Sequence, residues 1–350
     1  MLDEACERDE HRAPQKIHLE ENIMKVVITG ATGFIGRNLA DKLARNGAEI
    51  VCLTRQYSGK DKNCSPYQIR RVSYQDIQLL ADAIHDADYI FHVAGLTRGR
   101  TWEEYEHANI SATKNLLQAV CLSKANIRRF IYVSSQTAAG PTMGDKPTDE
   151  NDEPNPIPDD WYGTSKLMAE KVVKQYQNQI PVTIIRPPAV YGPYDRNFLG
   201  LFKTVCRYHV MPVIFPPTRE FTIVHVFDLI NGIKLAAFSE KSQSRIYFIG
   251  GQNISYSTFI DAFERAIQHR IHRLYLPSFV AKIAGELGEI KWTLTGRSTI
   301  LCRRKIRDLL QPRWICSWSA AERDLGYHPE IELVEGIRQT IKWYREAGWI

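Results

Sequence analysis

Hydrophobic residues gather in short runs between Lys25 and Arg186, and longer amphipathic stretches separate these runs. The runs are rich in β-branched and aromatic residues, which predicts buried strands, whereas the amphipathic stretches predict helices. We expect strands at 25–30, 49–53, 69–74, 88–93, 129–134 and 182–186, and helices at 36–46, 77–85, 102–123 and 162–178. Strands that alternate with helices predict right-handed βαβ units, so the chain is expected to be an α/β protein with a parallel sheet.

The pattern changes on either side of this alternating core. Residues 1–23 are polar and are predicted to form a flexible extension, with an ordered extra helix as the alternative. Residues 24–193 are predicted to form the main domain, which includes a Pro- and Asp-rich loop at 141–160. Residues 194–350 are predicted to form a smaller, mostly helical region. Within it, 219–249 is expected to return to the main sheet.

Composition narrows the class of protein. Of the 350 residues, 44% are hydrophobic and 24% are charged, which is typical of soluble globular chains. The net charge of +5 is spread along the chain, so no nucleic-acid partner is expected. Seven cysteines without a CxxC pair indicate reduced thiols, a cytoplasmic location and no metal site. No apolar run is long enough to predict a membrane-spanning helix.

A glycine-rich segment, TGATGFIG at 29–36, follows the first predicted strand and opens the first predicted helix. Gly30 would allow a tight turn, Gly33 would leave room for a pyrophosphate, and Gly36 would let helix and strand pack closely. Amide groups at the start of such a helix attract phosphate. An ordinary glycine turn is the alternative, but the strand–turn–helix context favours nucleotide binding.

The second predicted strand indicates which nucleotide is bound. An NAD site usually has an acidic residue at the end of this strand, and none occurs between Ile50 and Lys60. Arg55 stands there instead, and a guanidinium group suits the 2′-phosphate of NADP. We therefore expect NADP, with NAD possible. The alternative is that Arg55 is a solvated surface residue.

A second group of residues carries candidate chemistry. Tyr162 and Lys166 share one face of a predicted helix, where an ammonium group would lower the pKa of the phenol. Such a tyrosine can exchange a proton with a substrate oxygen. Ser135 comes at the end of a predicted strand, where open α/β sheets bind ligands, and Asn109 lies on the preceding helix.

These residues together resemble the extended short-chain dehydrogenases/reductases, a group also described as NAD-dependent epimerases/dehydratases. Further similar segments are HVAG at 92–95, RPPAVYGP at 186–193 and HVFDL at 225–229. The resemblance implies a doubly wound Rossmann domain with Ser135, Tyr162, Lys166 and Asn109 at the catalytic centre. It further implies cofactor contacts from Gly30, Thr32, Gly33, Phe34, Ile35, Gly36, Arg55, Asp76, Ile77, Ala94, Tyr162, Lys166 and Pro188.

Departures from the family pattern bear on the reaction. Gln136 and Thr137 replace the Asp-Glu pair of sugar-nucleotide dehydratases, and Ala189 replaces an Asn that contacts the substrate diphosphate in many epimerases. The sequence therefore favours hydride transfer between nicotinamide C4 and a secondary alcohol or ketone. This resembles the 3β-hydroxysteroid dehydrogenase and dihydroflavonol reductase branches.

Two alternatives to this function stay open. One is nucleotide-sugar epimerisation, and the other is a non-catalytic NADP-sensing regulatory protein. The expected partner is a small-molecule substrate, and a homodimer is possible.

Overall fold

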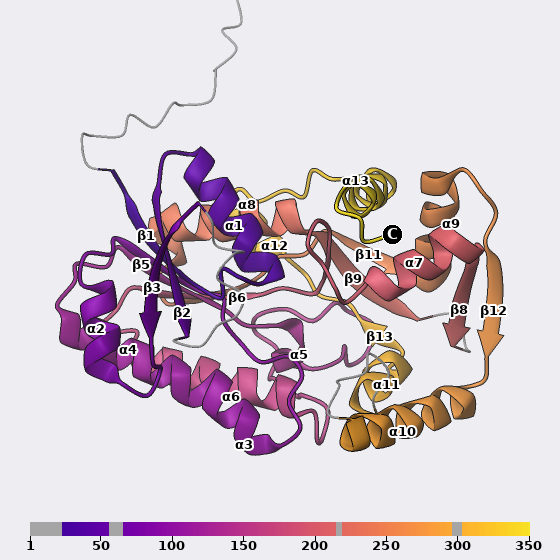
Figure 1. Cartoon of the computed structure of the whole chain (residues 1–350), viewed down its shortest axis with the longest axis horizontal. Helices are drawn as coiled ribbons and strands as arrows, with labels where there is room; N and C mark the ends of the chain where they lie inside the picture. The colour runs from indigo at the N-terminus through magenta and orange to yellow at the C-terminus, as the bar shows by residue number, and fades with distance from the viewer. Residues whose placement is uncertain (1–22, 56–65, 215–218, 296–302) are drawn as a thin grey trace, which may run out of the picture.

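Seven parallel strands form the centre of the molecule. The computed structural model describes residues 23–55, 66–214, 219–295 and 303–350 (Figure 1). All but the last residue of the extension expected at 1–23 lies outside these ranges. The sheet has the order β10-β6-β5-β4-β1-β2-β3. Its strands are β1 (Lys25–Thr29), β2 (Glu49–Arg55), β3 (Gln68–Val72), β4 (Tyr89–His92), β5 (Arg129–Val133), β6 (Val182–Arg186) and β10 (Arg245–Phe248).

Helices cover both faces of this sheet because its strands are apolar on both sides. Val26 and Ile28 face one core, and Val27 between them faces the other. The first core is closed by α1 (Phe34–Arg45), α8 (Val226–Phe238) and α12 (Ser319–Leu325). The second is closed by α2 (Ile77–Ile84), α4 (Ala112–Ser123) and α6 (Trp161–Gln175), which lie together along the other side of the sheet in Figure 1.

The order of strands defines where a ligand can bind. Neighbours β1 and β4 continue in opposite directions across the sheet, which makes the gap between their carboxyl ends the topological switch point. Gly30 follows β1 and Val93 follows β4 at this edge. Open α/β sheets bind ligands in the crevice at such a point. The predicted fold class, a doubly wound α/β fold, is thus confirmed.

The second region contains two small sheets. Strand β9 (Glu220–His225) pairs with β7 (Ala189–Tyr191), β11 (Gln252–Ser255) and β13 (Arg313–Trp314), and β8 (Val210–Ile214) pairs with β12 (His272–Leu276). A separate apolar core joins α7 (Leu199–Tyr208), α9 (Tyr256–Ile267) and α13 (Leu333–Glu346), with Phe202 at its centre. The remaining helices of this region are α10 (Ser278–Thr295), α11 (Arg303–Leu310) and a short 3-10 turn at Glu240–Ser242.

The expected return of 219–249 to the main sheet is only partly observed. Strand β10 joins the edge of the seven-stranded sheet beside β6, but β9 does not reach it. The prediction is therefore wrong for 219–227. An apolar strand looks the same in sequence whichever sheet it joins, since its hydrogen-bond partners lie far away in the chain.

Two further segments shape the site. The helix expected at 102–123 is divided into α3 (Trp102–Tyr105), a π-helical segment (Glu106–Ser111) and α4. The loop at 141–160 is held against the second region, since Thr142 N–H donates to Arg313 O and Thr148 N–H donates to Ile315 O. Between β5 and this loop lies the short helix α5 (Gln136–Ala139).

Candidate active site

The turn after β1 is built from glycines that admit no side chain. Gly30 has φ of 72°, and a Cβ there would lie 2.7 Å from the backbone nitrogen of Ala94. A Cβ at Gly36 would collide with the carbonyl oxygen of Gly30. Gly33 has an ordinary φ of −92°, and a Cβ there would meet only Gly30 O at 3.2 Å. Gly30 and Gly36 therefore shape the turn, whereas Gly33 leaves its outer side open.

This turn suits a dinucleotide phosphate. Gly33 is the N-cap of α1, no side chain among the described residues caps this helix end, and its first turn has no acidic residue. Thr32, Phe34 and Ile35 surround the same end and are half-buried. Unpaired amide groups at a helix N-terminus attract phosphate oxygens. The residues present therefore fit a bound pyrophosphate.

The carboxyl end of β2 presents two polar groups beside this turn. The hydroxyl of Thr54 is buried and finds no hydrogen-bond partner within the described parts of the chain. Arg55 follows and is exposed. Because Thr29 of β1 pairs with Leu53 of β2, both side chains lie level with the glycine turn. A buried hydroxyl without a partner fits a ribose that supplies one.

Two other expected cofactor residues have structural tasks. Asp76 is the N-cap of α2, where its carboxylate accepts a hydrogen bond from Leu79 N–H at 2.9 Å, and Ile77 begins that helix. Arg37, one helical step beyond the glycine turn, lies 4.2 Å above the ring of Tyr194. Pro188 is half-buried directly after β6, at the same edge of the sheet.

The expected catalytic residues meet at the carboxyl end of β5. The ammonium group of Lys166 donates to Val133 O at 2.7 Å, and its side chain is 3% exposed. Ser135, two residues further, accepts hydrogen bonds from the amide and hydroxyl of Thr137. Tyr162 begins the helix that carries Lys166, and Asp160 caps that helix through Tyr162 N–H and Gly163 N–H.

The protonation states follow from burial. Desolvation raises the pKa of Tyr162 to about 12, against a smaller lowering by the hydrogen-bonding Ser135 hydroxyl. Desolvation lowers the pKa of Lys166 to about 7, against a smaller raising by the Glu170 carboxylate. The lowering of the tyrosine pKa that we expected from Lys166 is therefore not seen in the protein by itself. At neutral pH the phenol is protonated and can donate its proton.

Asn109 joins the nucleotide turn to the catalytic helix. It lies in the π-helical segment, where its side chain accepts from Leu96 N–H at 2.7 Å and donates to Leu96 O and to Ser165 Oγ. A Cβ on Gly95 would lie 3.3 Å from both Asn109 Oδ1 and Lys166 Nζ. Asn109 thus fixes the segment that includes Ala94 against α6. π-Helical segments occur often at functional sites.

His92, at the end of β4, is a second link below the glycine turn. Its ring hydrogen-bonds Thr29 Oγ1 at 2.7 Å and Thr113 Oγ1 at 2.8 Å, and Thr29 Oγ1 in turn accepts from Ala94 N–H. Desolvation, with a smaller effect of the Lys166 charge, lowers the pKa of His92 to about 3. The neutral ring is therefore a structural bridge.

Sequence reasoning missed a buried ionic cluster beneath Lys166. Glu170 accepts from Ser134 Oγ at 2.5 Å and from Arg186 Nε and Nη2 at 3.0 and 2.7 Å. All three side chains are at most 4% exposed. The signal was present, because Tyr162, Lys166 and Glu170 repeat every four residues along one helix face.

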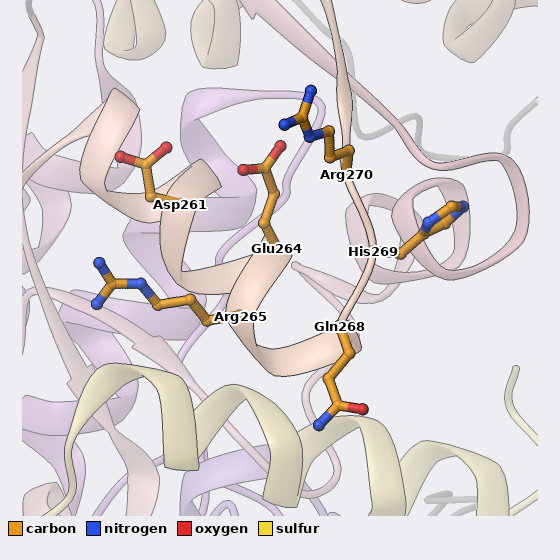
Figure 2. A pocket seen from close by; sticks show the side chains of 6 residues that line it. All are labelled: Asp261, Glu264, Arg265, Gln268, His269 and Arg270. Carbon is orange, nitrogen blue, oxygen red and sulfur yellow. The ribbon is translucent and has the colours of Figure 1, made fainter.

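A surface pocket lies elsewhere. Six side chains at the end of α9 line a cavity of about 430 Å³, and most of them are charged or polar (Figure 2). Asp261 and Glu264 there face Arg265 and Arg270, so the charges largely balance. No candidate catalytic residue lines this pocket.

Fold and site together define a dinucleotide-binding oxidoreductase of the Rossmann class. The chain belongs to the NAD dependent epimerase/dehydratase family, whose sequence model matches residues 26–250. Enzymes of this family and its relatives are NAD-dependent dehydrogenases, reductases and epimerases, and this protein is an enzyme of that kind.

Individual relatives cover nearly the whole chain. A ceramide reductase of Caulobacter vibrioides is 29% identical over 93% of this chain and 96% of its own. A 3β-hydroxysteroid dehydrogenase/isomerase of Mycobacterium tuberculosis is 26% identical over 93% and 92%. The crystal structure of UDP-glucuronic acid 4-epimerase from Bacillus cereus with NAD superposes with a TM-score of 0.74, at 22% identity over 93% and 99%.

Two searches of the described residues returned nothing. No helix there is long and apolar enough to cross a bilayer. Nor does that part of the chain gather three or more His, Cys, Asp or Glu side chains that could hold a metal ion.

Proposed function

We propose that the protein is an NADP-dependent reductase that converts a ketone of a hydrophobic, lipid-like substrate into a secondary alcohol. The observation that carries this proposal is the arrangement of Tyr162, protonated at neutral pH, beside Ser135 and the buried Lys166 at the carboxyl end of β5. A protonated phenol donates to a carbonyl oxygen as that oxygen gains negative charge.

Each residue has a defined task in the reaction. Bound NADPH supplies a hydride from nicotinamide C4 to the carbonyl carbon. The Tyr162 phenol gives its proton to the carbonyl oxygen, and Ser135 Oγ donates a hydrogen bond to that oxygen. Lys166 holds the ribose near Gly95 and stabilises the phenolate that forms. Solvent then returns the proton to Tyr162, which balances the reaction.

The choice of NADP is supported by the carboxyl end of β2. Residues 51–55 contain no acid that would repel a 2′-phosphate, and the exposed guanidinium group of Arg55 is free to approach it from the edge level with the glycine turn. Guanidinium groups bind phosphate through charge-assisted hydrogen bonds. Thr54 remains available to the ribose, so NAD would bind more weakly rather than not at all.

The substrate class is supported by what the site lacks and by its relatives. Gln136 and Thr137 follow Ser135 in place of an acidic pair, and Ala189 provides no amide for a diphosphate. Two relatives named above act on hydrophobic lipids by their names, ceramide and 3β-hydroxysteroid. These observations favour an apolar ketone over a nucleotide sugar.

Epimerisation of a nucleotide sugar is the second candidate function. It is supported by a relative, a UDP-glucose 4-epimerase of Vibrio cholerae that is 25% identical over 92% of this chain. The two are separated by incubating the protein with NADPH and either a long-chain 3-keto lipid or UDP-glucose. Net NADPH consumption with the ketone supports the reductase. Conversion of UDP-glucose without net NADPH consumption would overturn it.

A further inference from the structure

Helix α10 exposes a stripe of large apolar side chains. Phe279, Ile283, Leu287 and Ile290 are 63%, 54%, 61% and 55% exposed. Their spacing of four, four and three residues places them on one face of the helix. Isolated apolar residues on a surface are ordinary, but four in one continuous stripe mark an interaction surface.

The opposite face of α10 is made of small residues. Ala281 and Gly285 are buried there, and a Cβ at Gly285 would lie 2.9 Å from the side chain of Ile306 on α11. An amphipathic helix that packs on a core normally turns its large apolar residues inward. Helix α10 does the reverse, so its packing on α11 leaves the large residues available to something outside the molecule.

The surroundings of the stripe are basic. Helix α11, with the sequence RRKIRDLL, has four basic residues and one acid. On α10, Lys282 and Lys291 lie on either side of the stripe. The acids of α10 are Glu286 and Glu289, and Glu286 forms an ion pair with Arg303 of α11. An apolar stripe with a basic border complements an anionic phospholipid surface, as in helices that lie in the membrane interface.

The stripe adjoins the catalytic centre. Arg307 of α11 donates to Pro158 O at 3.0 Å and pairs with Asp159 at 3.4 Å, directly before the Asp160 cap of the catalytic helix. Figure 1 shows α10 and α11 at one end of the molecule, with α11 between α10 and the rest of the chain. A surface held by α10 would therefore lie near the entrance to Tyr162.

We propose that α10 docks in the plane of an anionic phospholipid bilayer, with its apolar stripe among the acyl chains and the basic residues of α11 at the headgroups. The purpose, delivery of a lipid-like ketone from the bilayer, rests on the function proposed above. The docking itself rests only on the stripe, its inverted packing and its basic border.

The test is sedimentation of the full chain with vesicles of phosphatidylcholine, with or without phosphatidylglycerol. Wild-type protein is expected to bind the mixed vesicles at least about tenfold more tightly than pure phosphatidylcholine. Phe279→Ser with Leu287→Ser should weaken binding by about tenfold or more, because each buried apolar side chain contributes a factor of that order. The matched control is Ile23→Ser with Leu122→Ser, two residues that are 72% and 50% exposed at the amino edge of the sheet.

Three results would overturn the docking proposal. The wild type could bind neither vesicle, the α10 variant could bind as the wild type does, or the variant could convert a wild-type dimer into a monomer, in which case the stripe covers a second copy. Turnover of a short, water-soluble ketone is measured in parallel and should be unchanged in the α10 variant. Loss of that turnover in the wild type would refute the proposed function and leave vesicle binding interpretable.

Discussion

Burial keeps the phenol of Tyr162 protonated, and this is the property on which ketone reduction depends. Tyr162→Phe removes the proton donor but keeps the ring. We expect turnover to fall by about 10² or more, the scale of general acid catalysis, while NADPH affinity stays nearly unchanged. Steady-state kinetics and calorimetric titration measure the two effects. Full activity in the variant would show that another group supplies the proton.

Lys166 makes the stability of the protein depend on pH. Desolvation lowers its pKa from 10.5 to about 7, so between these values the unfolded chain binds more protons than the folded one. Stability from this group therefore rises with pH across this window and is lowest below about pH 7. From pH 7 to about pH 9 the wild type should gain about 2 kcal/mol more than Lys166→Met. Urea unfolding at both pH values tests this, and equal gains would contradict it.

Arg55 is expected to decide between the two cofactors. A hydrogen bond to a charged group contributes about 1.5–3 kcal/mol, which is roughly tenfold to a hundredfold in affinity. Arg55→Ala should therefore weaken NADPH binding by that factor and leave NADH nearly unaffected. Calorimetric titration with both cofactors measures the difference. Wild-type protein that binds NADH as tightly as NADPH would return the chain to NAD.

At the scale of the element, the two glycines at the start of α1 should respond differently to alanine. Gly33→Ala meets only Gly30 O at 3.2 Å, so it should keep the fold but obstruct the phosphates. Gly36→Ala collides with the carbonyl of Gly30 and should destabilise the fold by about 1–3 kcal/mol. Thermal unfolding and NADPH titration of both variants compare these effects. Loss of stability in Gly33→Ala alone would reverse the assignment.

Most elements of the Rossmann domain could be predicted from the sequence because each has its own periodicity. The apolar run at 25–30 and the amphipathic stretch at 36–46 match β1 and α1 closely. The π-helical segment at 106–111 could not be predicted, since a π turn has no propensity of its own and forms where Asn109 is held by Leu96 and Ser165. Glu170 was missed because its partners come from distant strands.

At the scale of the whole molecule, sequence reasoning succeeded where contacts are local and failed where they are not. Tyr162 and Lys166 were found because four residues separate them on one helix. Strand β9 was assigned to the wrong sheet, because its pairing with β7 and β11 depends on how the second region folds around it. The exposed stripe on α10 also needed the structure, since an amphipathic sequence does not tell which face packs inward.

The most direct measurement of the proposed reaction follows a deuterium atom. NADPH labelled with deuterium at the transferred position of C4 is incubated with the protein and a long-chain 3-keto lipid, and the product is analysed by mass spectrometry. The account predicts one deuterium on the carbinol carbon of each alcohol formed, with one NADPH oxidised per alcohol, and loss of both in Tyr162→Phe. Unlabelled cofactor left intact while a nucleotide sugar changes its configuration would contradict it.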